Sequence, residues 1–165
     1  MTTSNEGGAT RVEQRSEREL VVTRRFDAPV HLVFEAWTRP ELFQRWWAPK
    51  SLGVPLLSCA MDVRTGGTYR LTFGQDAASA MSFFGRYIEV VSNSRLVWTN
   101  DEGTEGAVTT VTFEAADGGT LLTYADLYPD KAALEAERGA EQGLPEQFEQ
   151  LDALLLDLAG ATAQQ

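Results

Sequence analysis

The chain has 165 residues, of which 43% are hydrophobic and 23% are charged, and these values are typical of one folded domain with its own core. A formal net charge of -10, with only 14 Lys and Arg residues, argues against nucleic acid or an anionic membrane surface as a partner. One cysteine excludes an intramolecular disulfide, and no apolar run approaches the ~20 residues of a membrane-spanning helix, so a cytoplasmic location is expected.

The two ends of the chain are predicted to lie outside the folded domain. Residues 1–17 are almost entirely polar, with a single valine, and cannot bury enough apolar surface to offset their ordering entropy. We therefore expect a disordered N-terminal tail over residues 1–17 and a folded domain over residues 18–160. Residues 161–165 are expected to form a frayed C-terminus.

The folded part begins with a strand and two short helices. Residues 20–26 are a β-rich run and form the first predicted strand. Asp27 and Pro29 follow as an acidic cap and a proline in the first turn of a helix. Apolar residues at helical spacing give that helix one buried face: Val30, Val33, Phe34 and Trp37. Pro40 ends it, and residues 38–41 have the pattern of a capping box that starts a second short helix.

Beyond these helices the pattern changes to short β-rich segments separated by turns. Strands are predicted at residues 56–63, 68–73, 81–91, 95–100, 108–114 and 120–127. Gly66 and Gly67 mark one of the turns between them. Short connections favour antiparallel neighbours, because parallel strands need long crossovers. With the first strand, the sequence predicts seven antiparallel strands.

The last predicted element is a long amphipathic helix. Residues 130–138 form at most a helical turn or two, and the long helix begins near Pro145. Its apolar stripe consists of Phe148, Leu151, Leu155 and Leu158. This helix is the only element long enough to cover a face of the sheet. The predicted fold class is therefore α+β, a curved seven-stranded antiparallel sheet around a long C-terminal helix, with two short helices after the first strand.

Eight segments in this order carry a family resemblance. They are residues 26–29, 33–38, 40–42, 46–49, 62–69, 85–90, 95–98 and 119–123. Together they resemble the START-like (SRPBCC, helix-grip) superfamily, and within it the branch related to activators of the 90-kDa heat-shock-protein ATPase. The resemblance implies the helix-grip fold. The superfamily includes lipid carriers, hormone binders, polyketide cyclases and co-chaperone domains, so the fold alone does not choose a function.

Residues with catalytic chemistry are few. His31 is the only histidine, and we interpret it as a surface residue of the first helix, without an orienting carboxylate. Cys59 lies in the middle of a strand, where a buried thiol is expected rather than a nucleophile. The acidic loop residues Asp101, Glu102 and Glu105 are interpreted as solvated. The sequence therefore predicts no catalytic residues, no metal site and no cofactor.

The aromatic residues are more informative. Strand alternation places many of them on the sheet face that points toward the long helix, and a curved sheet with one helix leaves a space that side chains or a ligand fill. We predict that a ligand contacts Trp46, Tyr69, Leu71, Phe73, Trp98, Phe113, Tyr124, Phe148 and Leu151. Three candidates for a polar contact are Arg70, Arg86 and Tyr87. Which of Trp46 and Trp47 faces the interior is left open.

Three functions are compatible with these observations. The first is non-catalytic binding of a small apolar or aromatic molecule in a cavity between sheet and helix. The second, implied by the resemblance, is a chaperone-linked module of the stress response. The third is a cyclase- or hydrolase-like enzyme of the same superfamily. The expected partners are thus a small apolar or aromatic ligand and, for the second function, a chaperone, with no nucleic acid and no membrane span.

Overall fold

The structure is a computed structural model that describes residues 10–101, 106–137 and 144–163. Its strands are β1 (Arg11–Gln14), β2 (Glu19–Phe26), β3 (Leu56–Met61), β4 (Thr68–Phe73), β5 (Met81–Val91), β6 (Arg95–Thr99), β7 (Val108–Ala116) and β8 (Gly119–Leu127). Its α-helices are α1 (Val30–Thr38), α2 (Pro40–Phe43), α3 (Lys131–Glu137) and α4 (Leu144–Ala163). Two 3-10 helices are η1 (Lys50–Leu52) and η2 (Ala77–Ser79).

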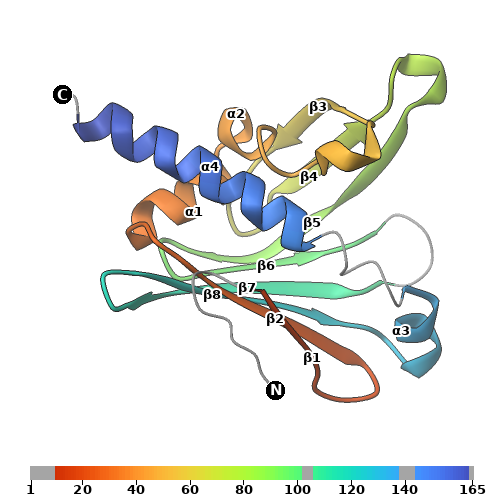
Figure 1. The fold of residues 1–165 in the computed structure, drawn as a ribbon. Coiled ribbons are helices and arrows are strands. Elements are labelled where there is room, and N and C mark those ends of the chain that lie inside the picture. Colours follow the sequence, from red (N-terminus) through yellow and green to blue (C-terminus); the bar gives the residue numbers. More distant parts are fainter. Residues whose placement is uncertain (1–9, 102–105, 138–143, 164–165) are drawn as a thin grey trace.

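All of these strands belong to one antiparallel sheet with the order β1-β2-β8-β7-β6-β5-β4-β3. From β3 to β8 each strand pairs with the next along the chain, and β2 pairs with β8. The sheet curves around α4, and β3, β4 and the first part of β5 extend to one side of that helix (Figure 1). The predicted α+β helix-grip fold is confirmed.

The sheet bends at β5, which pairs with two different neighbours. Its first part pairs with β4 and its last part with β6, with a register shift between Tyr87 and Glu89. Gly85 lies at this bend. A Cβ atom at Gly85 would lie 2.0 Å from the carbonyl oxygen of Thr99 and 2.9 Å from the ring of Tyr69. Glycine therefore allows the close approach of strands on which the bend depends.

The main core lies between the inner face of the sheet and helices α1, α2 and α4. Strand pairing aligns side chains on this face, so that Val22, Tyr124, Val111 and Leu96 form one row across four strands. The largest fully buried side chains are Trp37, Trp46, Phe26 and Phe148. They come from α1, the segment after α2, β2 and α4, and their packing fixes these elements around the inner face.

A second, smaller cluster holds α3 against the start of β2. It consists of Leu20, Ala107, Tyr128, Ala133 and Leu134. The Asp130 carboxylate accepts a hydrogen bond from the backbone N–H of Ala133 at 2.8 Å, which caps the start of α3. The predicted helical turn or two at residues 130–138 corresponds to this helix.

The structure differs from the expected disordered tail. β1 pairs antiparallel with β2, with Val12 opposite Val22, so the sheet has eight strands instead of seven. Backbone pairing with β2 forms this edge strand. All four of its side chains are exposed, so the sequence shows no alternation that would predict a strand. The predicted tail is therefore wrong at residues 11–14, while residues 1–9 lie outside the described part. At the other end, α4 continues to Ala163, inside the segment expected to fray.

The two predicted helix caps are also corrected. Pro29, not Asp27, is the N-cap residue of α1, and no side chain caps it. The predicted capping box at residues 38–41 does not form, because the Thr38 hydroxyl donates instead to the Phe34 carbonyl at 2.9 Å. Glu41 pairs with Arg39 at 2.6 Å. Pro40 lies in the first turn of α2, a position that favours proline, whereas Pro29 directly precedes the first helical residue of α1.

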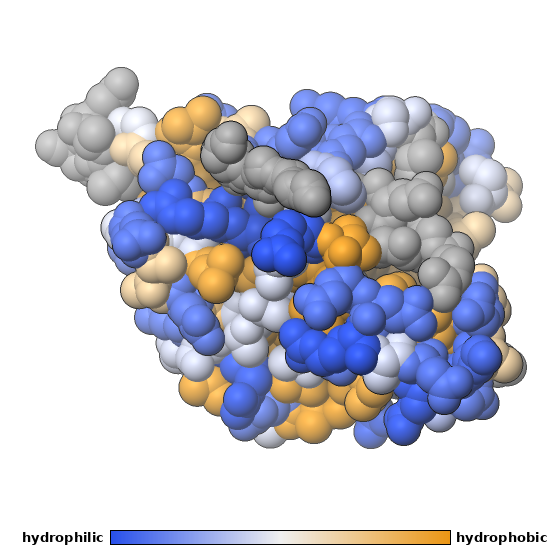
Figure 2. Space-filling view, turned by 60° about the horizontal axis from the view of Figure 1, so that its bottom comes forward, coloured by the Kyte–Doolittle hydropathy of each residue, from blue (hydrophilic) through white to orange (hydrophobic). Residues whose placement is uncertain are grey.

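The outer surface mixes hydrophilic and apolar side chains. On the face in Figure 2, hydrophilic residues predominate, and apolar areas lie between them. Scattered apolar exposure of this kind is normal for a folded protein. Within the described residues, no helix is both long and apolar enough to cross a membrane.

Candidate functional site

Trp37 lies at the centre of the aromatic interior. Apolar residues at helical spacing on α1 are buried, and Trp37, at the end of that stripe, is only 1% exposed. Its ring centroid lies 6.0 Å from that of Trp98 on β6 and 6.2 Å from that of Tyr124 on β8. The indole also lies 4.8 Å from Trp46. Helix and sheet therefore meet at this side chain.

The two consecutive tryptophans after α2 differ in burial, one inside the core and one at its edge. Trp46 is fully buried, and its indole N–H donates to the Ala36 carbonyl at 2.9 Å. Trp47 is half-buried and stacks on Phe43 with a centroid distance of 4.8 Å. The structure thus places Trp46 inside the core and Trp47 at its edge, 5.8 Å from the Trp37 ring.

Glutamine side chains of α4 hold this tryptophan segment in place. Gln147 donates a hydrogen bond to the Trp47 carbonyl. Gln150 donates to the carbonyls of Trp46 and Ala48 at 2.9 and 3.0 Å. These bonds fix the segment against the N-terminal half of α4.

The nine residues predicted to contact a ligand come together in one hydrophobic cluster. Seven are buried, and Phe73 and Tyr124 are partly buried against them. They come from the segment after α2, from β4, β6, β7 and β8, and from α4. The predicted placement on the inner face is therefore correct, and their role in ligand binding stays a prediction.

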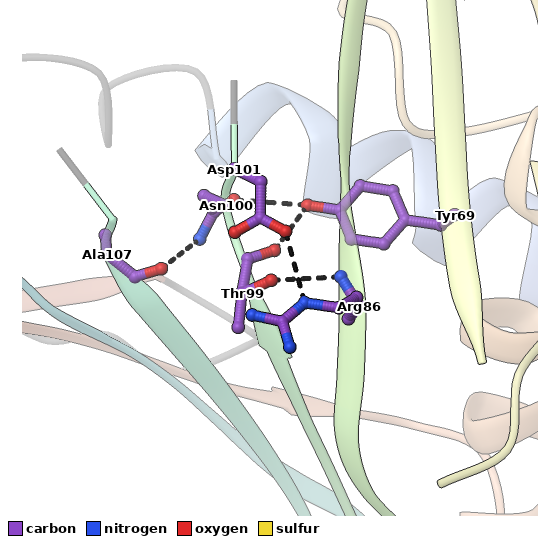
Figure 3. A network of polar contacts seen from close by, with 6 residues as sticks. All are labelled: Tyr69, Arg86, Thr99, Asn100, Asp101 and Ala107. Carbon is purple, nitrogen blue, oxygen red and sulfur yellow. Dashed lines mark hydrogen bonds and ion pairs between the residues drawn. The ribbon is translucent and has the colours of Figure 1, made fainter. Parts of the chain in front are cut away.

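A polar network closes the β4–β6 side of this cluster (Figure 3). The Tyr69 hydroxyl donates to the Thr99 carbonyl at 2.8 Å and lies 3.4 Å from the side-chain oxygen of Asn100. The Asn100 amide donates to the Ala107 carbonyl and to the Thr109 hydroxyl, each at 3.0 Å. The Thr109 hydroxyl in turn donates to an Asp126 carboxylate oxygen at 2.5 Å. The interior thus has a polar boundary beside its aromatic wall.

Of the three candidates for a polar contact, only Tyr87 points inward. It pairs with Trp98, is 5% exposed and belongs to the core. Arg70 lies on the outer face, with its guanidinium 4.8 Å from the Phe84 ring centroid. Arg86 is exposed and pairs with Asp101 at 3.4 Å (Figure 3). The alternation of side chains along β4 and β5 places Tyr87 on the inner face and the two arginines on the outer face. For β5, the sequence alone left this alternation ambiguous.

Burial raises the pKa values of two phenols and one thiol of the interior. It raises the pKa of the Tyr87 phenol, and Cys59 and Asp62 add to the shift. Burial likewise raises the pKa of Tyr124 well above its ordinary value, with Asp126 contributing. The pKa of the Cys59 thiol rises to about 11 because of burial. At neutral pH these groups are hydrogen-bond donors, not nucleophiles or bases.

The inner face remains apolar where α4 no longer covers it. Phe83 pairs with Leu71, so both side chains point to the same face as the core. Phe83 is nevertheless 36% exposed, and its ring contacts Phe73 edge-on at 5.5 Å. Met81, which pairs with Phe73, is 62% exposed. The aromatic interior therefore continues into an accessible apolar rim on β4 and β5, formed by Phe73, Met81 and Phe83.

Arg24 is an unexpected charge under α4. Its side chain is 6% exposed, and Nη2 lies 2.6 Å from the Asp152 carboxylate of α4. The guanidinium lies 4.7 Å from the Phe26 ring centroid, and Nη1 donates to the Phe148 carbonyl at 3.5 Å. This contact clamps the helix to β2.

Two buried donor atoms in the described structure lack a hydrogen-bond partner: Arg24 Nε and Trp37 Nε1. The indole N–H of Trp46, by contrast, has a hydrogen-bond partner. Buried polar groups usually have a partner, so each exception calls for an explanation.

Two residues of this site, Trp37 and Phe83, escape the sequence prediction, and for a third, Tyr87, the sequence leaves the direction of the side chain open. Trp37 follows the apolar spacing of α1 and is read from sequence only as core. Tyr87 and Phe83 lie on β5, whose alternation becomes readable only once the bend at Gly85 is known. Glycine inside a strand pattern was the signal for that bend.

The described residues contain little else with catalytic character. His31 is exposed, as expected. Among these residues, no group of three His, Cys, Asp or Glu side chains could hold a metal ion. Of the predicted acidic loop, Asp101 is described and exposed, while Glu102 and Glu105 lie outside the described residues.

Comparison with solved structures shows the same fold in several bacterial proteins. A Rhodobacter sphaeroides protein is 24% identical, with a TM-score of 0.81 over 90% of this chain and 99% of that chain. A Mycobacterium smegmatis protein is 23% identical, with a TM-score of 0.78 over 91% and 99% of the two chains. An AHSA1-like protein from Aeromonas hydrophila is 20% identical, with a TM-score of 0.68 over 82% and 92%. No protein of curated function matches. The family described as Activator of Hsp90 ATPase homolog 1-like protein matches residues 27–156, most of the sequence, and the chain therefore belongs to that family.

Proposed function

We propose that the protein binds a small, mainly apolar or aromatic molecule between the inner face of the sheet and α4. The observation that carries this proposal is the apolar rim. One sheet face runs without interruption from buried Tyr69 and Leu71 to exposed Phe83 and Met81. Apolar side chains that a fold leaves exposed beside an aromatic interior are the usual lining of a ligand site.

The chemistry of the interior favours binding over catalysis. Tyr87, Tyr124 and Cys59 have raised pKa values and stay protonated at neutral pH. A general base must accept a proton near the working pH, and a cysteine nucleophile must be a thiolate. These groups meet neither condition. They and the Trp98 ring supply instead a wall that holds a flat apolar molecule and offers hydrogen-bond donors.

Adjacent phenylalanines provide a matched test. Phe83 points to the inner face and Phe84 to the outer face, where it pairs with Arg70. The probe is prodan, a neutral naphthalene dye whose emission shifts in apolar surroundings. We expect a dissociation constant on the order of 10 µM, as typical ligand efficiencies give for a molecule of this size.

Phe83→Ala should weaken prodan binding roughly fivefold or more, because a lost aromatic contact is worth about 1 kcal/mol. Phe84→Ala should leave binding within about twofold of the unmodified protein on the same scale. Equal effects of the two substitutions, or no binding at all, would contradict the proposal.

The family match favours a second candidate, stimulation of the ATPase of a 90-kDa heat-shock protein. Such an activity depends on a partner surface and not on the interior. It therefore predicts clear ATPase stimulation that does not require binding of prodan to the interior. Clear stimulation together with no dye binding would replace the first function with the second.

A further inference from the structure

The Trp37 indole N–H is a buried donor without a protein partner. The residue is 1% exposed, and Nε1 has no hydrogen-bond partner among the described residues. Trp46 provides an internal comparison, because it is buried as deeply and its N–H is bonded to Ala36. The fold thus satisfies one indole of the pair and leaves the other without a partner among the described residues.

An unsatisfied buried donor is costly, and a well-packed interior is expected to avoid it. The rings around Trp37 explain why the protein does not satisfy it. Trp98, Tyr124, Trp47 and Phe113 all lie within 6.3 Å, centroid to centroid. Aromatic faces and edges pack well against an indole, but they are poor acceptors for its N–H.

On the basis of the proposed function, we infer that Trp37 Nε1 donates a hydrogen bond to the bound molecule. The ligand then combines a flat aromatic or polycyclic body with a hydrogen-bond acceptor, of which a ketone, ester or amide carbonyl is the simplest kind. The aromatic body contacts the Trp37 and Trp98 rings, and the carbonyl oxygen accepts from the indole.

The acceptor is neutral. An anionic ligand would have to lose its hydration in an aromatic interior, at a high cost. It would also approach the Asp126 carboxylate, which raises the pKa of the adjacent Tyr124. Arg24 does not provide a countercharge for such a ligand, because it is already paired with Asp152.

Two nearly isosteric probes isolate the hydrogen bond. 2-Acetylnaphthalene and 2-ethylnaphthalene share the ring and differ in the carbonyl oxygen. We expect the acetyl compound to bind the unmodified protein about fivefold more tightly, the value of one net hydrogen bond. In Trp37→Phe, which keeps an aromatic ring but removes the N–H, this preference should be lost, because the acetyl oxygen would be buried without a donor.

A measurement on the unmodified protein tests whether the Trp37 indole donates to the ligand, even if Trp37→Phe fails to fold. In a ¹⁵N–¹H spectrum, the Trp37 indole signal should move downfield with the acetyl compound relative to the ethyl compound. Because both carry the same naphthalene ring, ring-current effects largely cancel in this comparison. The Trp46 indole signal, already bonded, should show no such difference.

The outcomes separate the inference from the proposed function. If both compounds bind with equal affinity and the Trp37 signal does not distinguish them, the inference is wrong and the interior binding function stands. A preference that survives Trp37→Phe also overturns the inference. If neither compound binds, the proposed function fails and the inference falls with it.

Discussion

Two aspartates of α4 form ion pairs that differ in burial, and this difference predicts unequal effects on stability. Asp152 lies 2.6 Å from Nη2 of Arg24, a side chain that is 6% exposed. Asp157 lies 3.1 Å from Arg45, and both of those side chains are exposed. Asp152→Ala and Asp157→Ala make the same chemical change on the same helix, and each removes one negative charge. Helix propensity and overall charge repulsion therefore nearly cancel between them.

The expected magnitudes follow from the surroundings of the two pairs. An exposed ion pair contributes about 0–1 kcal/mol, so Asp157→Ala should cost less than about 1 kcal/mol. Removing one partner of a fully buried pair costs about 3–5 kcal/mol. Asp152 is 40% exposed, and Arg24 keeps a bond to the Phe148 carbonyl, so the cost should fall below that range. We expect Asp152→Ala to cost about 2 kcal/mol.

Urea unfolding followed by circular dichroism at 222 nm measures both changes. With a slope of about 2 kcal/mol per M, Asp152→Ala should lower the midpoint by about 1 M and Asp157→Ala by less than about 0.5 M. The Asp152 effect should persist in 1 M NaCl, since salt screens a buried contact poorly. Equal midpoint shifts, or loss of the Asp152 effect in salt, would refute the reading of Arg24 as a buried clamp.

Two further predictions concern the core. Leu151→Ala should lower the free energy of unfolding by about 2–5 kcal/mol, because Leu151 is fully buried. Leu156→Ala, at a position 74% exposed, should lower it by less than about 0.5 kcal/mol. Similar urea midpoints for the two variants would show that α4 does not pack on the sheet. Folding raises the pKa of the Cys59 thiol from its ordinary 9.0 to about 11, so its contribution to stability is present below pH 9 and is lost as the pH rises toward 11. At pH 8 the folded protein should react with a disulfide reagent roughly 100-fold more slowly than the unfolded chain, as the smaller thiolate fraction requires; equal rates would show that the thiol is not buried.

Periodicity in the sequence predicts most of the fold. Alternation in β4 placed Tyr69 and Leu71 on the inner face, and helical spacing in α4 placed Phe148 and Leu151 against them. These patterns are readable because one side of each element is buried and the other is not. The family suggested by the sequence is likewise confirmed.

The features that the sequence does not predict depend on backbone pairing or on contacts distant in the chain. β1 has four exposed side chains, so only the free edge of β2 specifies it. Arg24 is next to Arg25 and looks like a surface residue until Asp152, far along the chain, is placed beside it. The missing partner of Trp37 Nε1 is a property of the whole interior and has no local signal.

The most direct test of interior binding is to locate a bound molecule by intermolecular nuclear Overhauser effects. With 2-acetylnaphthalene bound in the interior, we expect contacts from the naphthalene protons to the methyl groups of Leu71 and Leu96, which point to the inner face. Val91 and Leu127 lie on the outer face, and their exposed methyl groups serve as the comparison. Contacts to Val91 or Leu127 instead of Leu71 and Leu96 would contradict the account.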